Sequence, residues 1–165
     1  MSVWVRWFLV GCLATVTMDI GATLFREAGV TMGLSPRLIG RWFAYVLRGQ
    51  LSHHSILESP PVPGEMPLAI AGHYLIGVVL TLVFAAGLYV QTRGPISAGM
   101  TFTLALGFGL LTNLLPFFIM FPAMGFGDFG LAGPPALLLY RTSLLNHVLF
   151  GAGLGLFARL FRVLG

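Results

Sequence analysis

Residues 96–122 read ISAGMTFTLALGFGLLTNLLPFFIMFP and contain no charged side chain. A run of about 20 apolar residues is long enough for a helix to cross the hydrocarbon core of a bilayer. This segment is also far longer and more uniformly apolar than a strand of a soluble sheet. We therefore predict a membrane-spanning helix over about 96–121.

Three further segments are long and apolar enough to span, over about 3–25, 67–90 and 135–161. Of all residues in the chain, 57% are hydrophobic and 8% are charged, whereas soluble domains carry about 25% charged residues. This composition excludes a soluble globular protein. We predict an all-α fold: an integral membrane four-helix bundle that forms a single domain over 1–165.

An even number of spans places both termini on the same side of the membrane. The arginines divide almost equally between the two sides, with Arg93 in a short link at 91–95 counted on the side of the termini. Because positive residues in short loops favour the cytoplasm, the count leans weakly towards cytoplasmic termini.

The loop between the first two spans contains a predicted amphipathic helix over about 36–48, capped by Ser35, begun by Pro36 and ended by Gly49. Arginines share one face of this helix, and apolar and aromatic residues share another. That pattern is typical of a helix in the membrane interface. We predict lipid contact by Arg37, Arg41, Trp42 and Arg48.

The link between the third and fourth spans contains GFGDFG at 125–130, which matches the G-x-G-x-x-G spacing of dinucleotide-binding loops. That motif needs a preceding strand and an acidic residue about 20 positions later, whereas no Asp or Glu follows Asp128. We predict a flexible connector, with Pro134 near the start of the next helix, and no nucleotide. The nine basic residues form no basic run, so no nucleic-acid partner is predicted either.

Five polar side chains lie at similar depth in the four spans, about 9 to 18 Å from the loop-bearing surface at the helical rise per residue. They are Asp19, His73, Asn113, Arg141 and His147. A G-x-x-x-G pair at 151 and 155 shares the stripe of His147, so we expect this layer to face protein. A charge at mid-bilayer costs about 2.5 to 3.5 kcal/mol, so Asp19 is either functional or held in a structural pair, for example with Arg141.

The same residues leave an enzymatic alternative open. A metal or haem could be bound by His73, His147 and Asp19, but no H-x-x-x-H or E-x-x-H spacing supports such a site. Ser143 and His147 lie four apart on one helix, yet Asp19 alone could orient the imidazole, and no oxyanion donor is evident. The sequence therefore predicts no metal and assigns no cofactor.

Several motifs occur in an order that resembles a known family. They are TVTMDIG at 15–21, GRWFAYVLRG at 40–49, SHHSI at 52–56, PPVPGE at 60–65, GHYLIG at 72–77, FPAMGFG at 121–127 and HVLFGAGLGL at 147–156. This set resembles the small bacterial inner-membrane proteins catalogued as domain of unknown function 2938, and the resemblance covers nearly the whole chain. It implies a four-span helical fold and no particular reaction.

The absence of a complete catalytic set favours a small non-catalytic integral membrane protein. We expect it to act as an accessory subunit of a membrane complex or as a binder of a lipid-like ligand, in contact with the bilayer and with a protein partner or a second copy. Two alternatives stay open. One is a metal- or haem-dependent membrane enzyme that uses His73, His147 and Asp19. The other is an oligomeric transporter, since four spans rarely enclose a transport path alone.

Overall fold

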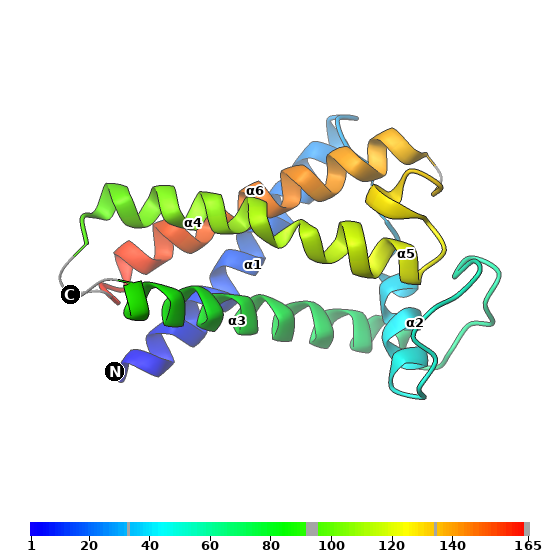
Figure 1. Ribbon diagram of the computed structural model, residues 1–165, viewed down its shortest axis with the longest axis horizontal. Helices are drawn as coiled ribbons and strands as arrows, with labels where there is room; N and C mark the ends of the chain where they lie inside the picture. Colours follow the sequence, from blue (N-terminus) through cyan, green and yellow to red (C-terminus); the bar gives the residue numbers. More distant parts are fainter. Residues whose placement is uncertain (33, 92–95, 134, 164–165) are drawn as a thin grey trace. The chain divides into compact units, whose positions relative to one another are not determined.

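The computed structural model describes residues 1–32, 34–91, 96–133 and 135–163, and all regular structure within them is helical (Figure 1). In this part of the chain, four helical segments are long and apolar enough to cross a membrane: Val3–Glu27, Glu65–Val90, Ala98–Ala123 and Leu137–Leu160. The predicted fold class is confirmed, and a helical segment long and apolar enough to cross a membrane lies at each predicted span. The predicted link residues 92–95, with Arg93, and Pro134 lie outside the described residues.

The helices that make up the first, second and fourth spans are α1 (Val3–Glu27), α3 (Glu65–Gln91) and α6 (Ala136–Leu160). The predicted amphipathic helix is α2 (Pro36–Val46), which ends two residues earlier than expected. Ser35 precedes Pro36 as expected, but its side chain makes no capping hydrogen bond, so that part of the prediction was wrong. Gly49 ends the helix with a positive φ of 86°, which lets the amide of Gln50 donate to the carbonyl of Tyr45 (3.0 Å).

The third span is not a single regular helix. It begins with α4 (Ala98–Thr112), continues through the π-helical turn η1 (Pro116–Met120) and ends in α5 (Phe121–Ala123). Pro116 has no amide hydrogen, so the regular hydrogen-bond pattern breaks at this point. The amide of Phe121 then donates to the carbonyl of Pro116, five residues earlier. Such π-helical turns are frequent at functional sites, which directs attention to neighbouring Asn113.

The chain forms two compact units. Unit 1 comprises Met1–Gly21, Tyr74–Thr112 and Leu145–Gly165, and unit 2 comprises Ala22–His73 and Asn113–Leu144.

Within unit 1, α1 and α3 pack closely in antiparallel directions because small residues of each face the other. A Cβ on Gly11 of α1 would lie 2.9 Å from the Cα of Val78 and 3.2 Å from Oγ1 of Thr81. One turn along, Gly77 of α3 lies directly against the hydroxyl of Thr15. The absence of side chains at these two glycines is therefore what allows the backbones to approach.

The remaining contacts of unit 1 complete a four-helix bundle. Phe84 of α3 lies against Phe108 of α4, with ring centroids 5.3 Å apart. A Cβ on Gly109 of α4 would lie 2.7 Å from the Cα of Gly151 in α6. A Cβ on Gly153 of α6 would lie 3.0 Å from the Cα of Ala14 in α1. The expectation that the 151/155 glycine pair faces protein is confirmed, since both glycines are buried against α4.

Unit 2 has its own apolar core, which is rich in aromatic rings. Its buried members are Ile56, Phe117, Phe121, Met124, Phe126 and Leu139. Two backbone hydrogen bonds join the 51–60 segment to the end of the third span, from His53 to Ala123 (2.8 Å) and from Ile56 to Met124 (3.0 Å).

The GFGDFG segment is packed into this core and is not the loose connector predicted from its glycines. Phe126 is 2% exposed, and Gly125 lies so close to the carbonyl of His54 that no side chain fits there. Gly125, Gly127 and Gly130 all have positive φ, which explains the glycine pattern without any nucleotide.

Candidate functional site

The most buried charged pair of unit 2 joins α2 to the first residue of α3. Nε of Arg41 donates to Oε1 of Glu65 at 2.6 Å, and the two side chains are 12% and 7% exposed. Nη1 of Arg41 also donates to the carbonyls of Ser59 (2.8 Å) and Ile56 (3.3 Å). Oε1 of Glu65 accepts a further bond from the amide of Val62 (2.8 Å). One guanidinium therefore joins α2, the 51–62 segment and α3.

The backbone geometry around this pair depends on Gly40. Gly40 is buried so tightly against the carbonyl of Glu65 that a Cβ could not be accommodated. Arg41 was predicted to contact lipid headgroups, but little of its side chain is left exposed for that purpose. Arg37 and Arg48 are exposed, and Trp42 is half-buried with its indole Nε1 donating to the carbonyl of Leu51 (3.0 Å).

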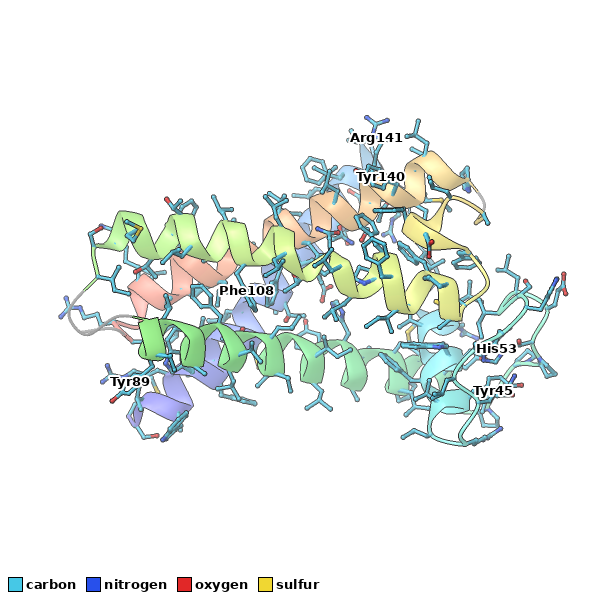
Figure 2. The ribbon with its side chains drawn as sticks, in the orientation of Figure 1. Tyr45, His53, Tyr89, Phe108, Tyr140 and Arg141 are labelled. Carbon is cyan, nitrogen blue, oxygen red and sulfur yellow. The ribbon has the colours of Figure 1, made fainter. Side chains whose placement is uncertain are left out.

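A histidine lies beside α2 in the same unit, as Figure 2 shows for Tyr45 and His53. Their rings meet edge to face with centroids 4.8 Å apart. Nδ1 of His53 lies 3.0 Å from Oγ of Ser59 and 3.3 Å from Nε2 of Gln50, and the hydroxyl of Ser59 also contacts the carbonyl of Ser55. Nε2 of His53 is buried without a hydrogen-bond partner among the described residues. Burial lowers the pKa of His53, which favours the neutral ring.

In unit 1, Asp19 is bound by a tyrosine. The hydroxyl of Tyr74 on α3 donates to Oδ2 of Asp19 on α1 at 3.0 Å. Arg141 was the partner suggested from the sequence, and Tyr74 was not predicted. A neutral hydroxyl can stabilise a buried carboxylate without introducing a second charge into the span.

A second polar pair of unit 1 links α4 to α6. Oγ1 of Thr112 lies 2.7 Å from Nδ1 of His147. The same hydroxyl donates to the carbonyl of Gly109 (2.6 Å), so Nδ1 of His147 carries the proton and donates to Thr112. The contact defines the tautomer of His147 and its ring orientation.

A third pair lies in unit 2, at the break in the third span. The hydroxyl of Ser143 donates to Oδ1 of Asn113 at 2.9 Å, and the two residues are 6% and 3% exposed. Nδ2 of Asn113 is buried and has no hydrogen-bond partner among the described residues. A buried unpaired donor is costly, so this amide needs an acceptor from water or a ligand.

Arg141 does not join a buried polar layer as predicted. It is exposed, and in Figure 2 its side chain points away from the helices. Among the described residues, Arg41 and Glu65 form an ion pair and Asp19 accepts a hydrogen bond from Tyr74, while the pairing of Asp19 with Arg141 stays a prediction. His73 is half-buried and interacts with a neighbouring residue.

The candidate catalytic side chains have hydrogen-bond partners that differ from those of a catalytic site. Within the described residues, no three His, Cys, Asp or Glu side chains are placed to hold a metal ion. The hydroxyl of Ser143 is directed to Asn113, and Nδ1 of His147 to Thr112, so each has a partner other than the one a nucleophile–base pair would require.

Three hydrogen-bond partners in these sites were not predicted from the sequence: Tyr74, Thr112 and Glu65. Tyr74 and Thr112 each adjoin a residue that was predicted, namely His73 and Asn113, so depth in the span could have indicated them. Glu65 begins a span directly after a Pro-rich link, where an acid is favoured by the helix dipole.

The family described as "Protein of unknown function (DUF2938)" has a model that matches residues 8–161. The chain belongs to this family. The match confirms the resemblance seen in the sequence, and for this DUF2938 member comparisons with curated proteins and with solved structures give no match. The DUF2938 match covers all three polar pairs and the Arg41–Glu65 pair, but its description names no activity for them.

Proposed function

We propose that the protein is a multi-pass protein of the bacterial inner membrane that works without catalysis, as an accessory subunit of a larger membrane complex. The observation that carries this proposal is an exposed strip of small residues on α4. Gly99, Thr103 and Gly107 are spaced four apart and all are exposed. They therefore share one outward stripe of the helix.

The glycines of the strip differ from those used inside the bundle. A Cβ on Gly99 or Gly107 would meet no described atom within 4 Å, whereas one on Gly109 or Gly151 would meet the opposing backbone within 3 Å. The hydroxyl of Thr103 donates to the carbonyl of Gly99 (3.1 Å), so this hydroxyl is not presented to lipid as an unpaired donor. Small residues at this spacing let a second helix approach closely in a membrane, which supports a partner helix here.

Native mass spectrometry after mild extraction tests the proposal. We expect the chain to appear in a complex with another membrane protein. The double variant Gly99→Leu/Gly107→Leu should lose that partner, because two leucines would hold the partner helix away from α4. Gly87→Leu is the matched control, since Gly87 of α3 is exposed and likewise has no described atom near its Cβ position. A lone monomer in the unmodified protein, or equal loss of partner in Gly87→Leu, would contradict the proposal. A homodimer would identify the partner as a second copy of this chain.

A lipid-like ligand is the second candidate, and the unpaired Nδ2 of Asn113 favours it. This donor would bind an oxygen acceptor of a ligand inserted at the break in the third span. The same spectra distinguish the two functions. Loss of a bound small molecule in Asn113→Leu, with protein partners retained, would favour the ligand, whereas a spectrum of Asn113→Leu identical to that of the unmodified protein would exclude it.

A further inference from the structure

The turn that follows α2 exposes two large apolar side chains beside a cation. Leu47 is 76% exposed and Leu51 is 63% exposed. Arg48 between them is exposed, with its Cζ 5.9 Å from the centroid of the Tyr45 ring. We call residues 47–51 the α2 corner. Exposed leucines beside a cation, next to aromatic rings, are the composition that binds membrane interfaces.

The α2 corner is held in a defined conformation. The amide of Gly49 donates to the carbonyl of Val46 (2.9 Å), and the amide of Gln50 donates to that of Tyr45 (3.0 Å). The indole of Trp42 donates to the carbonyl of Leu51 (3.0 Å). Because these bonds close the turn, the two leucines are presented without a large ordering cost on docking.

The position of α2 relative to the start of α3 places the corner near a membrane surface. Figure 1 shows α2 running crosswise to the first turns of α3. Gly40 contacts Glu65, and Phe43 contacts Gly72. If α3 enters the bilayer at Glu65, these contacts cover its outermost eight residues, which span roughly 10 Å at 1.5 Å per residue. That depth is the headgroup region in which amphipathic helices lie.

We propose that the α2 corner docks into the headgroup layer of a leaflet that contains anionic phospholipid, with Leu47 and Leu51 inserted and Arg48 bound to phosphate. The inference rests on the proposed function in one respect, namely that the chain spans a membrane. The positive charge of α2 and its corner favours an anionic lipid surface as the partner. Arg37 of α2 and Arg48 of the corner are exposed, while Glu65, the acid at the start of α3, is held by Arg41. Each arginine near an anionic surface strengthens binding about five-fold.

The test uses the full chain in nanodiscs, made either of phosphatidylcholine alone or of equal parts phosphatidylcholine and phosphatidylglycerol. An environment-sensitive fluorophore is attached to Leu47→Cys in a Cys12→Ala background, since Cys12 is the only native cysteine. Quenching by nitroxide on lipid headgroups, by nitroxide deep in the acyl chains and by aqueous iodide reports the surroundings of the probe. A second probe at Leu75→Cys, an exposed position within α3, reports the membrane interior.

We expect the Leu47 probe to be quenched mainly by headgroup nitroxide, and more strongly when phosphatidylglycerol is present. Arg48→Gln should reduce the docking equilibrium about five-fold in the anionic nanodiscs alone. Arg159→Gln, at an exposed position near the end of α6, should leave the Leu47 signal unchanged.

Iodide quenching of the Leu47 probe in both lipid compositions would overturn the inference. Protection of the probe from both iodide and nitroxide would also overturn it, because it would indicate that protein covers this position. Lack of any lipid quenching at Leu75 would instead refute the membrane-spanning premise. The failure of the inference and the failure of the proposed function are therefore distinguishable.

Discussion

Replacement of Arg41 by methionine should destabilise unit 2 more than replacement of an exposed arginine on the same helix. Methionine keeps much of the length of the side chain but removes all three hydrogen bonds of the guanidinium, to Glu65, Ser59 and Ile56. It also leaves the Glu65 carboxylate, whose side chain is 7% exposed, without its counter-charge.

The magnitude follows from this geometry. Removing one partner of a buried ion pair costs about 3 to 5 kcal/mol, because the remaining charge stays desolvated. Against a total stability of about 5 to 15 kcal/mol for a typical domain, this is a large fraction. Replacing both Arg41 and Glu65 by apolar residues should cost clearly less than the sum of the two single replacements, since no orphan charge is then left.

Two measurements check this prediction. Unfolding in mixed micelles with a rising fraction of sodium dodecyl sulfate gives the change in free energy of unfolding for Arg41→Met, for Glu65→Leu and for the double variant. Hydrogen exchange of the α2 amides detects local release of α2 from α3. Arg37→Met is the matched control, because Arg37 is exposed on the same helix and should change stability by no more than about 0.5 kcal/mol. Equal unfolding curves and equal exchange for Arg41→Met and Arg37→Met would refute the reasoning.

Three other perturbations have clear expected outcomes. Asp19→Leu should lower the detergent melting temperature, since it removes the acceptor of the half-buried Tyr74 hydroxyl bond and the loss of a hydrogen bond to a charged group usually costs about 1 to 3 kcal/mol. Asp128→Leu, at an exposed position, should leave the melting temperature unchanged. Gly40→Ala should prevent folding of unit 2, because a Cβ at that position collides with the carbonyl of Glu65, and Gly87→Ala, measured by the same melting curves, should be tolerated. The pKa of His53 is lowered by burial, so the unfolded chain binds the proton more readily than the folded one. The free energy of unfolding should therefore fall as the pH drops below about 6.5. His53→Gln should flatten this part of the pH–stability curve, and an unchanged curve would count against the burial argument.

The amino-acid sequence alone determined the elements of this protein. The four spans and the α2 helix follow from apolar run length, helical periodicity and the Pro36 and Gly49 boundaries, all of which act over one or two helical turns. The Gly151 and Gly155 contact was predictable for the same reason, since a four-residue spacing places both glycines on one helix face.

Only the tertiary structure decided which polar groups meet. Asp19 was correctly expected to need a partner, but whether that partner is Tyr74 or a histidine depends on the rotation of α1 against α3, which the Gly11 and Gly77 contacts set. Arg41 has the helical spacing of a lipid-facing residue, yet Glu65, far away in sequence, turns it inward. The glycines of GFGDFG indicated tight turns, but not that the segment packs against His54. In each case periodicity reports the face that a residue occupies on its own helix, whereas the opposing group is selected by contacts summed over distant parts of the chain.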